Sequence, residues 1–470
     1  MMRKTKIICT LGPASESETV LRQMVDAGMN VARLNFSHGT HEDHLKKIKL
    51  IKKIREDMQV ALPIMLDTKG PEFRIGTFEG GSVTLARGDL FDFTTDDVVG
   101  DKTKVSVTYK KITSQMLPGD RILLNNGLMT FEVLSVDENT VHTRVLDNGV
   151  LSDRKSMFFP EKELPLDYLS EQDKSDILFG IENGVDFIAC SFVSRAQDLI
   201  DVRNFLREHG NPDIDLIAKI ENRAGVNNLG EIMANSNGIM IGRGDMGVEI
   251  PFEELPAIQK KIISDCRING VRVITATEML ESMITNPRPT RAEISDVANA
   301  VYDGSSAIML SGETAAGKHP VGAIAAMSRI ALEAEQHVCY IGNIRDDEFK
   351  ITSVGESLSH SACDLAKGVK ASAIVVCTLT GKTARMVSRF RPQAPIIAMT
   401  TSEHAFRKLS LSWGVVPVMS EVFASTDVLF YFAKSKAKEI LGLTHGQRIV
   451  ITGGAANDKS GTSLIKVEEI

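Results

Sequence analysis

The chain has 470 residues, of which 43% are hydrophobic and 24% are charged, and its formal net charge is −7. This length exceeds what one hydrophobic core supports, so several domains are expected. The mild acidity and the lack of a long basic run exclude a protein that binds nucleic acid through the phosphate backbone.

The cysteines and the apolar runs indicate the compartment. The six cysteines are far apart and form no CxxC pair, which is typical of reduced thiols in a reducing compartment. The segment from Met1 to Gly12 lacks the apolar stretch of a secretory signal, and no run approaches the length of a membrane span. We expect a cytoplasmic protein with no membrane partner.

Short β-branched apolar runs recur along the first two thirds of the chain, each followed by a helical pattern. Eight of these runs begin at Lys6, Asn30, Ala61, Asp186, Asp215, Gly238, Val271 and Ser305. Apart from one long gap, successive runs start 23 to 34 residues apart, which fits one strand and one helix each. Eight such units predict a (β/α)8 TIM barrel.

The long gap separates the runs at Ala61 and Asp186 and spans 125 residues, too many for a structureless loop. Stretches within it alternate apolar and polar residues between turn signals, and they begin at Gly81, Lys104, Asp120 and Thr140. We therefore expect an inserted small antiparallel β-barrel domain over residues 71–165. The catalytic barrel would then comprise residues 1–70 and 166–338.

A helix from Val321 and a charged linker over residues 342–350 follow the eighth unit. Five further strand patterns begin at Ala371, Pro395, Gly414, Arg448 and Ser463, with helical patterns between the first four. This alternation predicts a C-terminal α/β domain, which we place at residues 339–470.

Polar residues stand at nearly every predicted strand end of the barrel, where barrel enzymes carry their active sites. Any one of them can be a helix cap, but a whole ring indicates a functional site. The ring consists of Thr10 and Gly12; Arg33, Asn35, Ser37 and His38; Asp67, Thr68 and Lys69; Ser191; Lys219 and Glu221; Arg243 and Asp245; Thr277 and Glu278; and Ser311 and Glu313.

Lys219 and Glu221 flank Ile220, so the two-residue period of a strand places both charges on one face. One interpretation is a buried ion pair, which is costly without further partners. In the other, Glu221 and Asp245, which ends the next strand, act as two oxygen ligands of a metal ion. Sparse carboxylates suit Mg²⁺ or Mn²⁺ better than zinc.

Two glycine-containing segments match nucleotide-binding motifs only in part. Residues 242–247 fit GxGxxG, but Asp245 inside the loop would repel a pyrophosphate, and Glu278 lies farther along than the acidic partner of that motif. Residues 380–383 end like a Walker A loop, yet Val376 stands where its first glycine is required. This second turn remains either a phosphate-binding loop, helped by Lys382, or an ordinary helix start.

The chain closely resembles the pyruvate kinase family over essentially its whole length. The matching stretches are CTLGP from Cys9, RLNFSHG from Arg33, LDTKGPEFR from Leu66, KIEN from Lys219, GRGDMGVEIP from Gly242, ITATEMLESM from Ile274, NPRPTRAE from Asn286 and LSGETAAGKHP from Leu310. Members of this family transfer the phosphoryl group of phosphoenolpyruvate to ADP, giving pyruvate and ATP. The resemblance implies Mg²⁺ or Mn²⁺ together with K⁺ as cofactors, and a homotetramer.

The resemblance also implies roles for individual residues. Glu221 and Asp245 would bind the divalent metal, Lys219 would stabilise the enolate and Arg33 would hold the phosphoryl group. Thr277 would lie beside the methylene carbon, while the backbone of Gly244 and Asp245 would hold the substrate carboxylate. The expected K⁺ ligands are Asn35, Ser37, Asp67 and Thr68, and the positions expected near the nucleotide are Thr10, Pro13, His38 and Arg74.

Some positions refine or depart from the family pattern. Glu72 stands where K⁺-dependent members carry glutamate, so we expect activation by K⁺. Asn125 and Asn126 replace a frequent aspartate pair, and the stretch from Lys155 also differs, which affects how the inserted domain covers the nucleotide. In the last domain, the resemblance implies a phosphate-binding loop for a sugar-phosphate effector, formed by Thr378, Thr380, Gly381, Lys382 and Thr383.

Two other functions compete with a kinase. A metal-dependent lyase acting on pyruvate or phosphoenolpyruvate on a similar barrel would need neither the inserted domain nor the K⁺ cluster. A phosphate-sensing binding protein would not need the intact set of Arg33, Lys219, Glu221, Asp245 and Thr277. Formation of ATP from phosphoenolpyruvate and ADP distinguishes all three.

Overall fold

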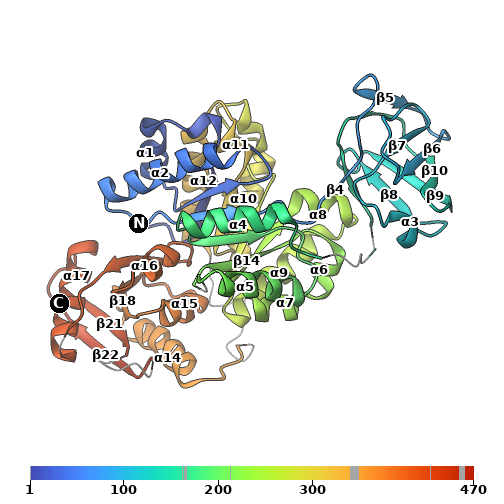
Figure 1. The fold of residues 1–470 in the computed structure, drawn as a ribbon. Helices are drawn as coiled ribbons and strands as arrows, with labels where there is room; N and C mark the ends of the chain where they lie inside the picture. Colours follow the sequence, from blue (N-terminus) through green and yellow to red (C-terminus); the bar gives the residue numbers. More distant parts are fainter. Residues whose placement is uncertain are drawn as a thin grey trace.

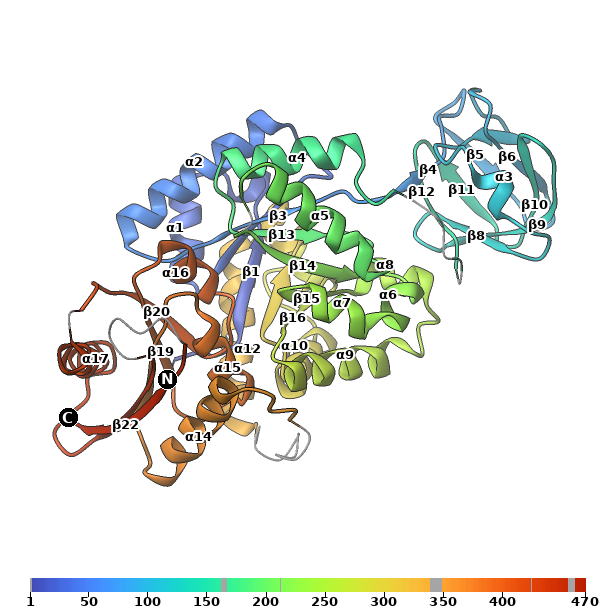
Figure 2. The same ribbon diagram turned by 60° about the horizontal axis from the view of Figure 1, so that its bottom comes forward.

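The computed structural model describes residues 2–160, 162, 167–211, 213–338, 349–423, 425–454 and 461–470. It has three parts, a central barrel, a β domain and a C-terminal α/β domain (Figure 1). The β domain and the C-terminal domain lie at opposite ends of the barrel (Figure 2).

Eight parallel strands close into the barrel in the order β1-β17-β16-β15-β14-β13-β3-β2. Their bounds are β1 (Lys6–Thr10), β2 (Val31–Asn35), β3 (Ile64–Asp67), β13 (Phe187–Cys190), β14 (Asp215–Ile220), β15 (Gly238–Gly242), β16 (Arg272–Ala276) and β17 (Ala307–Leu310). The barrel closes because β1 pairs with both β17 and β2. The predicted (β/α)8 barrel is therefore confirmed, with one strand in each of the eight apolar runs.

Helices surround the barrel, and several begin at side-chain caps that accept backbone N–H groups, such as Thr40, Ser170 and Thr290. The helices are η1 (Pro13–Ser15), α1 (Glu18–Asp26), α2 (His41–Met58), α4 (Glu171–Glu182), α5 (Ala196–Glu208), α6 (Arg223–Asn227), α7 (Leu229–Asn235), α8 (Arg243–Glu249), α9 (Leu255–Asn269), η2 (Glu281–Ile284), α10 (Arg291–Asp303), α11 (Gly312–Ala315) and α12 (Pro320–His337).

Two apolar layers determine where the charged side chains of β14 point. Ile217 belongs to the core inside the barrel, whereas Leu216 and Ala218 belong to the core between the strands and the outer helices. Because side chains alternate along a strand, Lys219 points into the barrel like Ile217. It does so at the carboxyl end of the strand, where barrel enzymes place their active sites.

The chain leaves the barrel after β3 and returns before α4, and the residues between form the β domain. Its elements are β4 (Phe73–Arg74), β5 (Ser82–Leu85), β6 (Leu90–Thr94), β7 (Lys104–Ser106), α3 (Ile112–Gln115), β8 (Arg121–Leu124), β9 (Met129–Val136), β10 (Thr140–Val145), β11 (Gly149–Ser152) and β12 (Ser156–Phe158). We call this domain the lid.

The lid contains a seven-stranded sheet in the order β4-β12-β8-β9-β10-β6-β7 and a separate antiparallel pair of β11 with β5. Phe91, Phe93 and Phe131 pack edge to face in its core. A bridge between Ile75 and Val107 brings the two edges of the sheet together. The strand pairs are antiparallel as predicted, except that β6 and β7 are parallel, because residues 95–103 carry the chain back along β6 before β7 begins.

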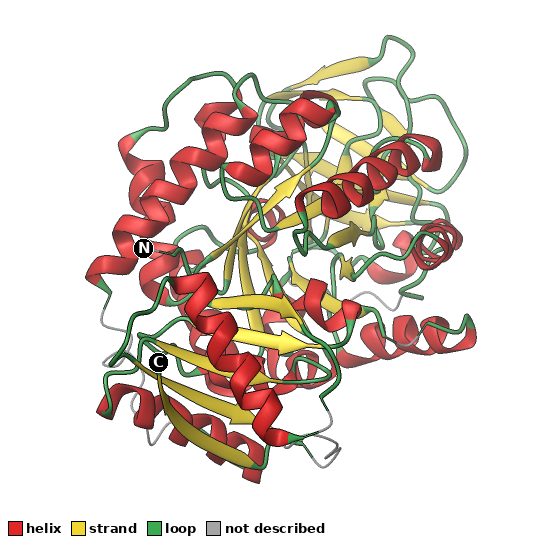
Figure 3. Cartoon of the chain, turned by 90° about the vertical axis from the view of Figure 1, so that its left-hand side faces the viewer, coloured by secondary structure: helices red, strands yellow, loops and turns green. Residues whose placement is uncertain are grey.

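The C-terminal domain contains a five-stranded sheet in the order β20-β19-β18-β21-β22, with helices on both faces (Figure 3). Its elements are α14 (Val354–Gly368), β18 (Ala373–Cys377), α15 (Lys382–Arg389), β19 (Ile396–Thr400), α16 (Glu403–Leu409), β20 (Val415–Met419), α17 (Thr426–Leu441), β21 (Arg448–Gly453) and β22 (Leu464–Glu469). The five predicted strands are confirmed. Most of the predicted linker and Cys339 lie outside the described residues.

The C-terminal domain covers the amino-terminal end of the barrel. Arg407 Nε donates to Asp186 Oδ1 at 2.6 Å and Lys408 Nζ donates to Asp215 Oδ1 at 3.1 Å, at the starts of two barrel strands. Leu411 is fully buried in the core inside the barrel. The opposite end, with the ring of polar residues, therefore faces the lid.

The three domain boundaries given above stay predictions, because the chain passes between parts over several residues at each of them. Among the described residues, no helix combines the length and apolar character needed to cross a bilayer.

Candidate active site

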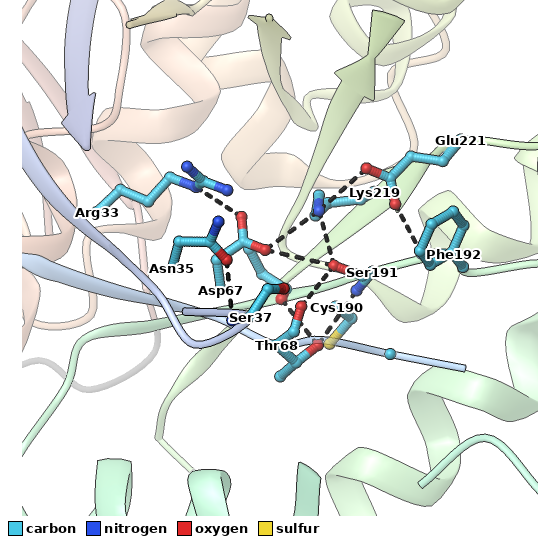
Figure 4. A network of polar contacts seen from close by, with 12 residues as sticks. Arg33, Asn35, Ser37, Asp67, Thr68, Cys190, Ser191, Phe192, Lys219 and Glu221 are labelled. Carbon is cyan, nitrogen blue, oxygen red and sulfur yellow. Dashed lines mark hydrogen bonds and ion pairs between the residues drawn. The ribbon is translucent and has the colours of Figure 1, made fainter. Parts of the chain in front are cut away.

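A connected network of charges and hydroxyls joins β2, β3, β13 and β14 at the carboxyl end of the barrel (Figure 4). Arg33 Nε donates to Asp67 Oδ2 at 2.7 Å, and Lys219 Nζ donates to Asp67 Oδ1 at 3.1 Å. Lys219 Nζ also donates to Ser191 Oγ at 2.7 Å, and the Ser191 hydroxyl donates to the Thr68 carbonyl at 2.7 Å. Asp67 and Ser191 thus fix the ammonium group of Lys219, and Arg33 and Thr68 in turn hold these two residues.

A third partner of Lys219 is Glu221, whose Oε1 lies 3.0 Å from Nζ. Glu221 Oε2 accepts a hydrogen bond from the backbone N–H of Phe192 at 2.9 Å. The buried ion pair considered from the sequence is therefore present. This ion pair does not exclude a catalytic role for Lys219, because several carboxylates surround this lysine and Glu221 is only one of them.

The charges within this network shift one another's pKa values. Burial alone would raise the pKa of Asp67, but Arg33 and Lys219 lower it below its ordinary value. Burial likewise opposes the charge on Lys219, but Asp67 and Glu221 raise the pKa of this lysine above its ordinary value. Both groups are therefore ionised at neutral pH, and Lys219 presents a fixed positive charge to the open end of the barrel.

Glu221 and Asp245 form a second, less satisfied pair of carboxylates. Burial and the neighbouring Asp245 raise the pKa of Glu221 above its ordinary value, although Lys219 opposes this shift. Burial is also the main cause that raises the pKa of Asp245. The two carboxylates and Asp67 outnumber the cations Arg33 and Lys219, so this part of the site lacks one positive charge.

The backbone around these carboxylates suits a metal ion. Asp245 lies in the first turn of α8 rather than at the end of β15 as predicted, because the helix begins directly at Arg243. Gly242 leaves room for Glu221, since a Cβ there would lie 2.6 Å from its Oε1. Two hard oxygen donors fit Mg²⁺ or Mn²⁺. The described residues contain no group of three or more His, Cys, Asp or Glu placed to hold a metal, so other oxygens would have to complete the coordination.

Thr277 directly follows β16, the strand next to β15, and lies beside the start of α8. Its Oγ1 accepts a hydrogen bond from the backbone N–H of Gly244 at 2.9 Å and donates to the Ala276 carbonyl at 2.6 Å. The structure therefore brings together the residues that the resemblance assigned to the substrate, on β14, the start of α8 and the end of β16.

The four predicted K⁺ ligands come from adjacent strands. Asn35 pairs in register with Asp67, and its side-chain oxygen accepts a hydrogen bond from the Ser37 backbone at 3.1 Å. Thr68 follows Asp67 and bonds to β13 through its hydroxyl and carbonyl groups. The set offers oxygen donors beside the charge network, which fits a hard monovalent cation.

The four positions predicted near the nucleotide are not held together by contacts with one another. Thr10 is buried, and its hydroxyl accepts a hydrogen bond from Arg33 at 2.8 Å. Pro13 and His38 are exposed at the same end of the barrel. Arg74 lies on β4, where the lid begins, and pairs with Glu72 at 2.7 Å. These positions therefore lie at the carboxyl end of the barrel and at the start of the lid.

The lid touches the barrel on α8, the helix that carries Asp245. The turn at Asn125, Asn126 and Gly127 has positive φ at all three residues, and a Cβ at Gly127 would lie 3.3 Å from Val248 Cγ1. Glu249, at the end of α8, accepts a hydrogen bond from the backbone of Phe159. The sequence reasoning did not single out Glu249, because only the fold brings it to the lid.

Burial raises the pKa of Glu249 from 4.5 to about 7, which predicts a pH-dependent stability. The pKa of Glu249 is higher in the folded protein than in the unfolded chain, so its protonated form stabilises the folded protein at low pH. This contribution is lost as the pH rises through 7. Glu249→Gln should therefore raise stability above pH 7, by roughly 3 kcal/mol at most, and have little effect below pH 4.5. Thermal unfolding at pH 5 and pH 8.5 measures this, with exposed Glu253→Gln as the control. A gain that is equal at both pH values contradicts it.

The predicted effector loop lines a separate pocket of about 940 Å³ in the C-terminal domain. Gly381 has positive φ at the start of α15, and its backbone N–H donates to Thr378 Oγ1 at 3.1 Å. Thr383 Oγ1 lies 2.7 Å from Thr462 Oγ1, and Thr380 and Lys382 also line the pocket. Residues 455–460, which follow β21 near this pocket in sequence, lie outside the described residues.

Ser191 and Phe192 contribute more than the sequence indicated. Ser191 was in the ring of polar residues but had no role, and it orients Lys219. Phe192 was not noticed, although its backbone holds Glu221 and its φ is +55°. Their position directly after a predicted strand was the available signal.

Together, a closed (β/α)8 barrel, a buried charged site at its carboxyl end and an inserted lid define the class of barrel enzymes. Comparison with known proteins makes this specific. Residues 2–324 match the family model "Pyruvate kinase, barrel domain", and residues 356–468 match "Pyruvate kinase, alpha/beta domain". The chain belongs to the pyruvate kinase family, whose members are phosphotransferases.

Similar proteins cover the whole chain. It is 43% identical to the pyruvate kinase of Clostridium perfringens over 100% of both proteins. It is 46% identical to that of Bacillus licheniformis, over 99% of this chain and 80% of the relative. A crystal structure of a pyruvate kinase from Cryptosporidium parvum superposes with a TM-score of 0.94 at 37% identity, over 99% of this chain and 96% of the other.

Proposed function

We propose that the charge network at the carboxyl end of the barrel is where the chain transfers the phosphoryl group of phosphoenolpyruvate to ADP, through an enolate of pyruvate. The reaction itself is that of the family. The observation that carries the placement is the buried Lys219, held by Asp67, Glu221 and Ser191, at a site where Glu221, Asp245 and Asp67 outnumber the cations Lys219 and Arg33. Phosphoryl transfer needs mainly positioning and charge neutralisation, and this site offers both.

Glu221 and Asp245 would hold Mg²⁺ or Mn²⁺, which when bound neutralises developing negative charge on the substrate oxygens. Lys219 stabilises the enolate oxygen through its fixed ammonium group. Arg33 offers the guanidinium atoms not bonded to Asp67 and Thr10 to the phosphoryl group. The backbone N–H groups at the start of α8 hold the substrate carboxylate, as the first turn of a helix favours an anion.

The nucleotide would bind on the rim formed by Thr10, Pro13, His38 and Arg74, beneath the lid. The contact between Gly127 and Val248 supports a lid that approaches the helix carrying Asp245. The chemistry of the Asn125–Gly127 turn, with amide rather than carboxylate side chains, suits contact with an anionic nucleotide.

We expect the kinase to require a divalent cation and to be activated by K⁺, bound by Asn35, Ser37, Asp67 and Thr68. ATP formation from phosphoenolpyruvate and ADP should disappear without Mg²⁺ or Mn²⁺. It should fall by at least about tenfold when K⁺ is replaced by tetramethylammonium, because the migrating phosphoryl group then loses an adjacent positive charge. Unchanged activity without K⁺ would refute this site, and absence of ATP under every condition would refute the kinase assignment.

We propose that the pocket at Thr378–Thr383 binds a phosphorylated effector. Lys382 and the backbone N–H groups at the start of α15 supply the positive end of a phosphate site. A panel of sugar phosphates should contain at least one that lowers the apparent KM for phosphoenolpyruvate, and Lys382→Gln should weaken that response by about tenfold. Lys438→Gln, an exposed lysine on α17, is the control. A response that survives Lys382→Gln unchanged would remove this loop from effector binding.

A cytoplasmic location and a homotetramer are proposed on the resemblance to the family. Sedimentation of the purified chain at several concentrations tests the second of these, and a monomer throughout would contradict it.

A further inference from the structure

The backbone at Thr277 is strained. Thr277 and Glu278 have φ of +66° and +56°, and two successive non-glycine residues in the left-handed region are unfavourable for side chains that carry a Cβ. Thr277 is β-branched, which makes this conformation still less favourable. Such a conformation persists only when surrounding contacts enforce it.

Arg243 supplies those contacts. Its Nε donates to the carbonyl groups of Ala276 and Thr277 at 3.3 and 3.2 Å, and its Nη2 donates to the Thr277 carbonyl at 2.6 Å. The guanidinium group therefore binds the two carbonyl groups on either side of the strained residue. Because Arg243 is the first residue of α8, it also ties this loop to the helix that carries Gly244 and Asp245.

Asp296 on α10 orients the guanidinium group. Its Oδ1 and Oδ2 accept hydrogen bonds from Arg243 Nη1 and Nη2 at 2.7 and 2.8 Å, a two-point arrangement that fixes the plane of the arginine. The arginine side chain is 13% exposed and that of Asp296 is 32% exposed, so the pair is partly shielded from water. A lysine has a single donor centre and cannot keep the geometry with Asp296 and both carbonyl groups.

Contacts on two sides therefore hold Thr277. From one side, the Gly244 N–H donates to Thr277 Oγ1, and from the other, Arg243 holds the Thr277 carbonyl. The hydroxyl of Thr277 is therefore fixed through both its side chain and its backbone.

We propose that Arg243, oriented by Asp296, is a positioning residue that holds Thr277 in its strained conformation for proton transfer at the methylene carbon of the substrate. This inference rests on the proposed function. After phosphoryl transfer, the enolate gains a proton at C3, the C2–C3 double bond becomes single and the C2 oxygen becomes a carbonyl. Arg243 does not touch the reacting atoms and acts through Thr277.

The reverse of this protonation, removal of a C3 proton from pyruvate, can be measured separately from turnover. An enzyme that protonates the enolate also removes a C3 proton from pyruvate, so pyruvate methyl protons exchange with D₂O, which NMR follows without net turnover. Arg243→Lys should lower this exchange by about 10-fold or more, while the KM for phosphoenolpyruvate changes by less than about threefold. Asp296→Asn should lower exchange by about threefold, because the arginine stays but loses its orientation.

A double-mutant cycle tests whether Arg243 acts through Thr277. Thr277→Ala alone should lower exchange by about 100-fold, and adding Arg243→Lys should then cost less than about threefold further. If the double variant instead loses the product of the two single losses in exchange, Arg243 and Thr277 act independently and the inference is overturned. If Thr277→Ala leaves exchange unchanged, the role proposed for Thr277 fails instead, which separates the two failures.

The matched control is another arginine ion pair at the same end of the barrel. Arg223 begins α6 and lies 2.9 Å from Glu254, and neither residue contacts Thr277 among the described interactions. Glu254→Gln should leave exchange within about twofold of the parent. Should Arg243→Lys unfold the protein, Asp296→Asn carries the same test, and equal exchange in Asp296→Asn and the parent would contradict the role of Asp296.

Discussion

Replacement of Lys219 by methionine is expected to lower kcat by about 1,000-fold or more while the KM for phosphoenolpyruvate changes by only a few-fold. The reason is that the ammonium group is needed mainly where negative charge develops on the enolate oxygen. Steady-state kinetics at saturating Mg²⁺ and K⁺ measure both parameters. Equal losses in kcat and in substrate affinity would mean that Lys219 binds the ground state and has no special role in the transition state.

The same substitution is also expected to destabilise the protein, because it removes a buried cation from between Asp67 and Glu221. Lys6→Met is the control that distinguishes a loss of stability from a loss of catalysis. Lys6 is buried at the start of β1, at the end of the barrel opposite the active site. Its Nζ donates to the Val415 carbonyl at 2.7 Å. Lys6→Met should change the unfolding temperature but leave kcat within about threefold of the parent.

Replacement of Glu221 by glutamine is the second change with a large expected effect. It should weaken Mn²⁺ binding by about 100-fold, since an amide oxygen replaces one of two carboxylate ligands. Titration with Mn²⁺, followed by electron paramagnetic resonance of the free ion, measures this without reference to turnover.

Glu313→Gln is the matched control for the metal experiment. Glu313 is also buried at the carboxyl end of the barrel, but its oxygens accept hydrogen bonds from the backbone of Leu280 and Ser311 at 3.1 and 2.7 Å. Its substitution should leave Mn²⁺ affinity within about threefold. Equal losses in both variants would show that the metal responds to the general charge of the site and not to Glu221 as a ligand.

Periodicity accounts for what could be predicted from the sequence. The eight apolar runs predicted the barrel, and the alternation in β14 placed Lys219 and Glu221 on one face of that strand, because side-chain direction along a strand is a local property. The order of the strands follows from the same runs, since consecutive parallel units pair with their neighbours. The lid and the C-terminal sheet were recognised for similar reasons.

Other features depend on tertiary contacts that no local pattern reveals. Asp245 was expected at a strand end, yet α8 begins two residues earlier, and only the fold shows that its backbone is helical there. The positive φ of Phe192, Thr277 and Glu278 is imposed by surrounding groups rather than by residue type. The parallel pairing of β6 with β7 likewise depends on the path of the chain between them.

The role of Ser191 could be predicted from the sequence only in part. Its place after a strand was visible in the sequence, but the lysine that it orients is 28 residues away. Contacts of this kind become predictable only once the neighbouring strands are known, which explains why the ring of polar residues was found before the functions of its members.

The location of Mn²⁺ in a crystal grown with pyruvate tests the central claim most directly, because anomalous scattering identifies the ion independently of activity. We predict one strong anomalous peak about 2.0–2.3 Å from a carboxylate oxygen of Glu221 and from one of Asp245. A peak beside Asp67, or none near either Glu221 or Asp245 at saturating Mn²⁺, would contradict the account.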